Sequence, residues 1–219
     1  MTLTRRLIAE ALGTALLLAI VVGSGIMSER IAGSSVGLAL LTNSLATGTG
    51  LIALILTFGP ISGAHFNPAV TLSQAWLGNI NWRDVGLYIM AQVIGAFAGV
   101  AAAHLMFEES VFSISEHIRN GPAQWWSEFI ATFGLLSVII GCFYSRPSIT
   151  PFAVGAYIMA AYWFTASTSF ANPVATLTRA ISNTFAGIHL THVPAFILSQ
   201  FLGAASATAI IGWLYRRSL

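Results

Sequence analysis

Two short asparagine–proline motifs are the residues of this chain best suited to act on a small molecule. The first is Asn67-Pro68-Ala69 and the second is Asn172-Pro173-Val174. Asparagine caps a helix N-terminus well, and proline is favoured at the first helical position, where its missing N–H costs nothing. Each motif therefore predicts a helix start, and each carboxamide can donate a hydrogen bond to an oxygen atom of a solute.

The helices predicted after these motifs are short. Each runs for about ten residues before a breaker, Gly78 in the first and Asn183 in the second. Ten residues rise about 15 Å, which is about half of the 30 Å hydrocarbon core of a bilayer. Two half-helices that begin near the middle of a membrane imply a polar path through it.

The bulk composition predicts an integral membrane protein. The 219 residues are 56% hydrophobic and only 7% charged, whereas soluble domains carry about 25% charged residues. The net charge of +2 gives no basis for a nucleic-acid partner. A single cysteine, Cys142, excludes an internal disulfide and a cysteine metal cluster, and we expect no metal, no cofactor and no catalytic residue.

Long apolar segments between the motifs predict membrane-spanning helices, because a backbone in lipid must satisfy its own polar groups. No alternation of period two, typical of barrel strands, is visible. We expect an all-α membrane protein with six transmembrane helices and two re-entrant half-helices. The six segments are approximately 6–27, 35–58, 85–106, 124–144, 150–168 and 194–215.

The two halves of the chain repeat each other. Glu10-x-x-Gly13-Thr14 returns as Glu128-x-x-Ala131-Thr132, and Gln92-x-x-Gly95-Ala96 returns as Gln200-x-x-Gly203-Ala204. Three spans per half is an odd number, so the second copy must be inverted, and inverted repeats place a substrate path at their interface. We expect one channel domain over 1–219, with repeats at 5–106 and 124–217 and an external linker at 107–123.

The distribution of arginine predicts the orientation, because positive charge is enriched in cytoplasmic loops. With both termini in the cytoplasm, the external side carries only Arg30 and Arg119. Six arginines then lie inside: Arg5, Arg6, Arg83, Arg146, Arg216 and Arg217.

In their order along nearly the whole chain, these motifs resemble the aquaporin and aquaglyceroporin (major intrinsic protein) family. The Gly63-Ala64-His65-Phe66 lead-in before the first asparagine belongs to the same resemblance. The family implies a homotetramer with one pore in each protomer. The altered Val174 and Ala175 resemble a bacterial, arsenic-associated branch, and the bacterial inner membrane is the expected location.

The segments that precede the asparagines are expected to line the pore with backbone carbonyls, because irregular backbone is tolerated in a bilayer only beside a water-filled cavity. We expect Glu10 and Glu128 to accept hydrogen bonds from N–H groups of these segments. His65 either supports its segment or lines the cytoplasmic half of the pore. The expected pore-lining residues are Gly63, Ala64, His65, Phe66, Ser167, Thr168, Phe170 and Ala171.

Water-selective family members narrow the pore with an aromatic residue, a histidine and an arginine. Matched by spacing, the four filter positions here are Thr47, Ala160, Ser169 and Ala175, none of them bulky or charged. This departure predicts a wider mouth. Arg179 lies one helical turn after Ala175, and it is either a displaced filter charge in the vestibule or a partner of Glu108, Glu109 or Glu116.

These features favour a passive channel for small uncharged solutes, such as glycerol-like polyols, arsenite or methylated arsenicals, and for water. A water-selective aquaporin with an atypical filter is the first alternative. A coupled secondary transporter is the second, although no acidic or histidine pair is placed to carry a coupling proton. An intramembrane enzyme is disfavoured, because the spans contain no paired catalytic carboxylates and no His-Glu-x-x-His motif.

Overall fold

The computed structural model describes residues 1–215 of the chain. The predicted all-α architecture is confirmed, and the described residues contain no strand. Arg216 and Arg217, and with them the end of the second expected repeat, lie outside the described residues. The elements are α1 (Leu3–Ala32), α2 (Val36–Ser62), α3 (Pro68–Trp76), α4 (Trp82–Phe107), α5 (Pro122–Ser145), η1 (Pro147–Ile149), α6 (Thr150–Phe164), α7 (Pro173–Arg179), η2 (Leu190–His192) and α8 (Val193–Tyr215).

Five of these segments are long and apolar enough to cross a membrane: α1, α2, α4, α5, and η2 together with α8. The sixth expected span, 150–168, is shorter than predicted, because α6 ends at Phe164 after 15 residues. Thr165 is already extended, and Thr168 and Ser169 take left-handed backbone angles (φ 62° and 52°) that no helix tolerates.

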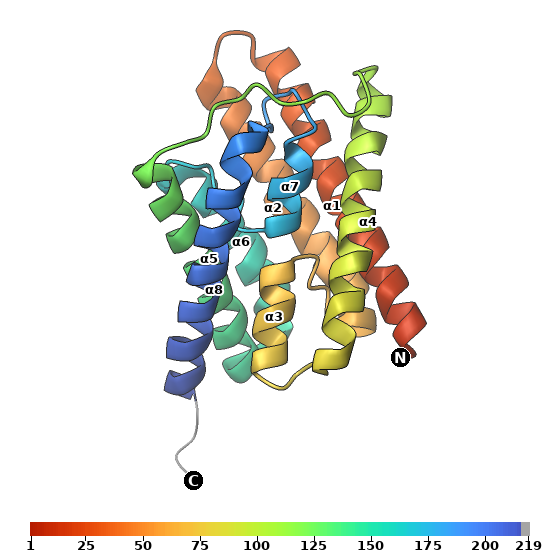
Figure 1. Ribbon diagram of the computed structural model, residues 1–219, viewed down its shortest axis with the longest axis vertical. Helices are drawn as coiled ribbons and strands as arrows, with labels where there is room; N and C mark the ends of the chain where they lie inside the picture. The colour runs from red at the N-terminus through yellow and green to blue at the C-terminus, as the bar shows by residue number, and fades with distance from the viewer. Residues whose placement is uncertain (216–219) are drawn as a thin grey trace.

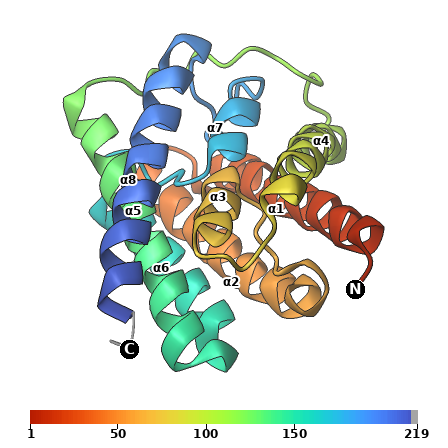
Figure 2. The same cartoon turned by 60° about the horizontal axis from the view of Figure 1, so that its bottom comes forward.

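The two predicted half-helices are confirmed. α3 has nine residues and α7 has seven, and each carries proline at its first position behind an asparagine cap. They begin near the middle of the molecule and run toward opposite ends of it (Figure 1). Seen toward the end where α3 finishes, α3 lies inside a ring formed by the long helices (Figure 2).

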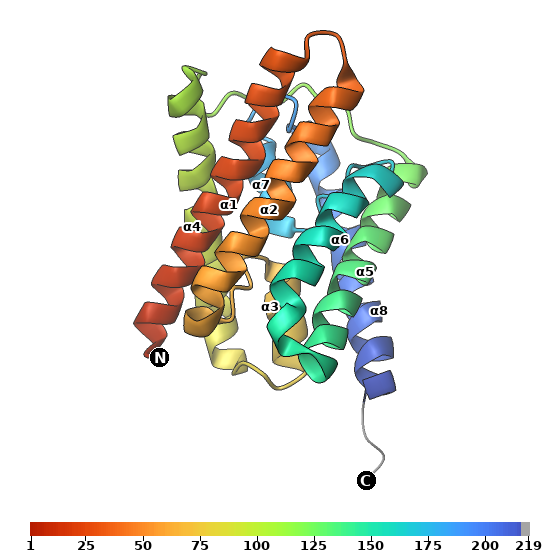
Figure 3. The ribbon, with the colours of Figure 1, turned by 180° about the vertical axis from the view of Figure 1, so that it is seen from behind.

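The long helices form two similar groups around the half-helices. α1 packs along α4 and α2, and α5 packs along α8 and α6. The contact of α2 with α6 closes the ring on the far side (Figure 3). The tightest approaches are at small residues: a Cβ atom added to Gly95 would collide with the carbonyl oxygen of Ala11, and one added to Gly203 with that of Phe129.

The outside of the bundle is apolar. Large aliphatic side chains on the outer helix faces stay exposed, including Leu12, Ile94 and Leu198 at 53%, 63% and 61%. A soluble monomer rarely exposes so much contiguous apolar surface, whereas a lipid-facing surface requires it. The chain is therefore an integral, multi-pass membrane protein.

Candidate functional site: a central cavity between the half-helices

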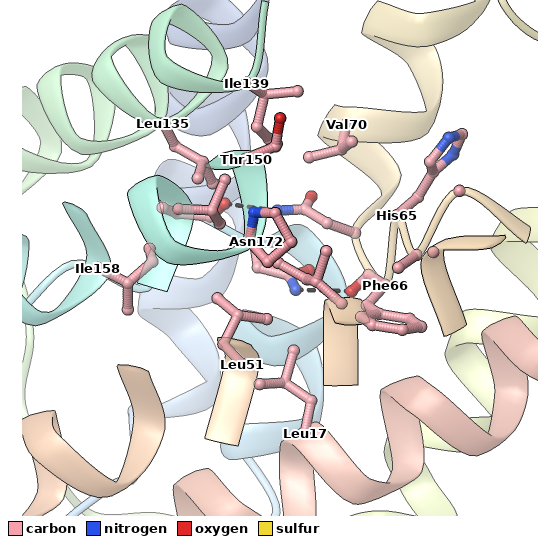
Figure 4. A pocket seen from close by; sticks show the side chains of 18 of the residues that line it. Leu17, Leu51, His65, Phe66, Val70, Leu135, Ile139, Thr150, Ile158 and Asn172 are labelled. Carbon is pink, nitrogen blue, oxygen red and sulfur yellow. Dashed lines mark hydrogen bonds between the residues drawn. The ribbon is translucent and has the colours of Figure 1, made fainter. Parts of the chain in front are cut away.

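A cavity of about 660 Å³ runs along the axis of the bundle, past the ends of both half-helices. We call its end beside Arg6 and Asn79 the α3 mouth, and its end beside Thr47, Tyr162 and Arg179 the α7 mouth. Aliphatic side chains from the spanning helices form one wall, several of them visible around Asn172 in Figure 4. They are Leu17, Val21, Leu51, Ile55, Leu135, Ile139, Val154 and Ile158.

The opposite wall is built from the two irregular, non-helical segments that precede the asparagines, in which several residues have positive φ angles. Gly63, Ala64, His65 and Phe66 line the cavity, and so do Ser169, Phe170 and Ala171. No described residue donates a hydrogen bond to the carbonyls of Gly63, Ala64 or His65. These acceptors and the aliphatic wall give the cavity one polar and one apolar side.

Ser167 and Thr168 do not line the cavity, contrary to expectation. The carbonyl oxygen of Ser167 and the hydroxyl of Thr168 instead accept hydrogen bonds from Arg119, at 3.2 and 3.3 Å. The turn from Thr165 to Thr168 directs this part of the segment away from the lumen, because the Thr168 N–H bonds back to the Thr165 carbonyl.

The two asparagines lie at the centre of the cavity, each tied to its own helix and to the other half of the molecule. The Oδ1 atom of Asn67 accepts from the Ala69 N–H at 2.9 Å, and that of Asn172 from the Val174 N–H at 3.1 Å. Each Nδ2 atom donates one hydrogen bond to the other half of the molecule. Asn67 donates to the carbonyl of Ala171, and Asn172 donates to the carbonyl of Phe66. Because a carboxamide nitrogen carries two hydrogens, each asparagine keeps one donor for the lumen.

A buried carboxylate holds the lead-in segment in each half. Glu10 accepts from the N–H groups of His65 and Phe66, at 3.0 and 2.8 Å. Glu128 does the same for Phe170 and Ala171, at 2.8 and 2.9 Å. Both side chains are fully buried, and these charge-assisted bonds offset the cost of their desolvation.

One glutamine and one threonine extend each carboxylate cluster. Gln92 Nε2 donates to Glu10 at 2.8 Å and to Thr71 Oγ1 at 2.9 Å. Gln200 Nε2 makes the equivalent bonds to Glu128, at 2.6 Å, and to Thr176, at 2.7 Å. The structure thus brings the echoed Glu and Gln motifs together, one cluster behind each half-helix.

His65 lines the half of the cavity that contains α3. Its Nδ1 atom is 3.2 Å from the Thr71 hydroxyl, and its ring lies 5.3 Å from the ring of Tyr88. The Tyr88 hydroxyl accepts from Arg6 and donates to the carbonyl of Ser62. His65 therefore contacts both the lumen and the residues that support its own segment.

At the α7 mouth, Thr47, Ser169 and Ala175 line the cavity, but Ala160 does not. Ala160 is exposed on the outer face of α6, and the spacing match to it is wrong. Beyond Thr150 and Pro151 at its start, the lumen-facing residues of α6 are Val154, Ile158 and Tyr162. Their i, i+4 and i+8 spacing is the signal that could have identified Tyr162, since such residues share one helix face.

Tyr162 makes this mouth narrower and more polar than the four expected positions suggested. Its hydroxyl is 3.2 Å from the Thr47 hydroxyl, and the two share a hydrogen bond. The Ser169 hydroxyl is buried and has no hydrogen-bond partner among the described residues. A solute hydroxyl in the lumen could satisfy it.

Arg179 also lines the α7 mouth. Its Nε atom donates to the carbonyl of Ala186, and its guanidinium carbon lies 3.3 Å from the centre of the Phe170 ring. The expected pairing with Glu108, Glu109 or Glu116 is wrong within the described residues, whose two ion pairs are Arg6–Asp84 and Arg30–Glu109. Both terminal nitrogens lack a described partner, so their N–H groups remain available to a solute.

Arg119 lies close behind the α7 mouth without lining the cavity, a position that the sequence did not predict. It belongs to the segment between α4 and α5, but its side chain turns inward and is only 9% exposed. Burial lowers the pKa of its guanidinium, and Glu128 and Tyr162 oppose that shift electrostatically. Its guanidinium carbon lies 5.1 Å from the centre of the Phe170 ring, the same ring that contacts Arg179.

Comparisons with known proteins agree with this geometry. Residues 1–169 match the family model described as major intrinsic protein. An aquaglyceroporin, AqpS, of Rhizobium meliloti (strain 1021) is 51% identical over 97% of this chain and 91% of its own length. Aquaporin NIP6-1 of Arabidopsis thaliana is 31% identical over 95% of this chain and 70% of its own.

A solved structure supports the fold independently. The X-ray structure of the aquaglyceroporin from Plasmodium falciparum superposes with a TM-score of 0.70, at 20% sequence identity, and covers 95% of both chains. At that identity the likeness concerns the fold alone.

Proposed function

The chain belongs to the major intrinsic protein family, and we propose that it is a passive channel for small uncharged solutes and water. The expected solutes are glycerol-like polyols and neutral metalloid hydroxides such as arsenite or methylated arsenicals. The names of the relatives support the polyol part of the proposal, since the 51% identical protein is an aquaglyceroporin. The altered Val174 and Ala175 are the reason for including the arsenicals.

The observation that carries the proposal is the two-sided wall of the cavity. Unpaired carbonyls and the asparagine amides lie on one side and aliphatic side chains on the other, and a polyol has O–H groups and C–H groups to match them. Among the described residues, no aspartate or glutamate lines the cavity, whereas Arg6 and Arg179 do. The N-termini of α3 and α7 add partial positive charge at the centre. Cations are thus opposed along the whole path.

We assign the pore-facing roles as follows. Asn67 and Asn172 donate to the solute at the midpoint, and Thr47, Ser169, Ala175 and Tyr162 form the filter at the α7 mouth. Arg179 supplies the donor and the positive charge of this mouth, one turn beyond the position that carries arginine in water-selective family members. Glu10 and Glu128 act as scaffolds that hold the lead-in segments in their irregular, non-helical course.

In the membrane, we propose that the α7 mouth faces outward, with both termini in the cytoplasm. Residues 5–106 and 124–217 form the inverted repeats, and 107–123 is the external linker. We further propose a homotetramer in a bacterial inner membrane, with one pore in each protomer. Cross-linking in native membranes tests the assembly, and labelling of introduced cysteines from either side tests the orientation.

Flux into proteoliposomes tests the function itself. We expect glycerol, arsenite and water to equilibrate down their gradients at rates that do not depend on a proton gradient, while sodium and protons stay excluded. Uphill accumulation driven by a proton gradient would instead support the coupled transporter. Permeation of water alone would support the water-selective alternative.

A further inference from the structure

Arg119 is the feature of the structure that the proposed function does not use. It lies in the segment that links the two halves, where an arginine would ordinarily be solvated. Instead its side chain is buried, with no carboxylate of the described residues within ion-pair distance. Burying a charge costs free energy unless the charged group makes good hydrogen bonds. The groups that bond Arg119 therefore indicate which part of the structure it stabilises.

Arg119 bridges two backbone segments that border the α7 mouth. Its Nε atom donates to the carbonyl of Gly187 at 2.8 Å, and Nη2 donates to that of Phe185 at 3.3 Å. Its Nη1 atom donates to Ser167 and Thr168, just before the lumen-facing part of the second lead-in segment. One guanidinium group thus joins the lead-in segment to the loop after α7.

Arg179 is held by the same two segments. The carbonyls of Phe185 and Gly187 bind Arg119, and the carbonyl between them, that of Ala186, binds Arg179. The ring of Phe170, the residue that follows Ser169, contacts both guanidinium groups. A shift of the backbone strip formed by residues 185–187, or of Phe170, would therefore move Arg179 as well.

We propose that Arg119 is a positioning residue of the channel, which fixes Arg179 and Phe170 and thereby sets the width of the α7 mouth. The inference rests on the proposed function. It implies that the linker between the halves contributes to the selectivity of the channel through Arg119. Without Arg119, the 185–187 strip and the lead-in segment lose four hydrogen bonds. Arg179 then leaves its fixed position, and the mouth admits larger neutral solutes.

A permeability ratio tests this proposal. In proteoliposomes, the erythritol-to-glycerol ratio reports the width of the narrowest point independently of the number of channels. We expect Arg119→Gln to raise this ratio at least about threefold, and Arg179→Gln to raise it by a similar factor. Arg119→Lys keeps the charge but loses the bridging geometry, so its ratio should lie between that of Arg119→Gln and the wild-type value.

The matched control is Arg30→Gln. Arg30 lies on the same side of the molecule and bonds Glu109, the second residue of the linking segment after α4, but it is half-exposed. Its loss should leave the ratio unchanged. The double variant Arg119→Gln/Arg179→Gln is decisive, because a residue that acts largely by fixing Arg179 should change the ratio little once Arg179 is gone.

An unchanged ratio in Arg119→Gln, or full additivity in the double variant, would overturn the positioning role while leaving the channel assignment intact. A wild-type channel that passes neither polyol would instead overturn the proposed function, and the inference with it. If Arg119→Gln does not fold, the Arg119→Lys ratio decides: a raised value supports the proposal, and a wild-type value contradicts it.

Discussion

Asn67 and Asn172 each donate a hydrogen bond to the residue that immediately precedes the other. Asn67 Nδ2 bonds the carbonyl of Ala171 at 2.8 Å, and Asn172 Nδ2 bonds the carbonyl of Phe66 at 2.9 Å. This reciprocal pair connects the two halves at the centre of the cavity. It also fixes the direction of each carboxamide, so that the second N–H of each group is oriented without further cost in side-chain entropy.

Replacing either asparagine by alanine should therefore slow solute flux strongly. Asn172→Ala removes a helix cap, worth about 1 kcal/mol, together with the bond to Phe66 and the lumen donor. We expect glycerol flux per channel to fall at least about tenfold, and Asn67→Ala to behave alike because its bonds are equivalent. The control is Asn81→Ala, since Asn81 precedes α4 without a side-chain cap bond. Equal flux in all three variants would contradict a role for the pair.

Neutralising a buried scaffold carboxylate should destabilise the fold. In Glu128→Gln, an NH2 group replaces one of the two carboxylate oxygens, so either the Phe170 N–H or both the Ala171 N–H and the Gln200 amide lose their acceptor. Loss of bonds to a charged group costs about 1.5–3 kcal/mol each before relaxation. We expect a clearly lower unfolding temperature in detergent by tryptophan fluorescence, and no such change in Glu116→Gln, whose side chain is exposed. Equal unfolding temperatures would remove the scaffold role.

The close helix contact at Gly95 gives a stability prediction with a matched control on the same helix. Gly95→Ala places a methyl group against the backbone of α1, and overpacking of this kind costs about 1–3 kcal/mol. Gly86→Ala adds the same methyl group where nothing lies within 4 Å. Because alanine has a higher helix propensity than glycine, the stability of this variant should equal or slightly exceed that of the wild type. Thermal unfolding of both variants tests the contrast, which would be reversed or absent if α1 and α4 did not pack as described.

The lumen-facing side of α6 can be tested with one bulky residue at two positions. Ile158→Trp puts an indole into the cavity and should abolish polyol flux, because Ile158 lines the aliphatic wall. Ala160→Trp puts it on the outer face and should leave the flux per channel near the wild-type value. If Ala160→Trp blocked flux and Ile158→Trp did not, the filter position assigned from sequence spacing would be reinstated.

Local sequence signals were sufficient for much of this architecture. The asparagine–proline pairs predict α3 and α7 because capping and the fixed φ of proline act within a few residues. The long apolar segments predict the spanning helices for the equally local reason that each must satisfy its own backbone in lipid. The end of α6 at Phe164 was missed, because Thr165 to Ser169 are small residues that contain no proline or glycine to mark the end of a helix.

Long-range contacts explain the rest of what was missed. Tyr162 was overlooked because the match to the filter positions was made by residue spacing alone. That spacing gave Ala160, which lies two residues from Tyr162 and therefore on the opposite side of the helix. In the sequence, Arg119 resembles an ordinary linker arginine. Its partners Gly187 and Ser167 lie far along the chain, so no local pattern predicts these contacts. Contacts over such separations depend on the packed structure rather than on local propensity.

The central claim, that an open filter at the α7 mouth admits solutes larger than water, is tested most directly with Ala175→Arg. Ala175 lines the cavity one helical turn before Arg179, so an arginine there would extend into the lumen. Stopped-flow light scattering on proteoliposomes would compare water, glycerol and arsenite permeation in the wild type and the variant. We predict that the wild type passes all three, and that the variant retains water but loses glycerol and arsenite. A wild type that passes water alone would contradict the claim, and Tyr162 or Arg179 would then be the residue that closes the mouth.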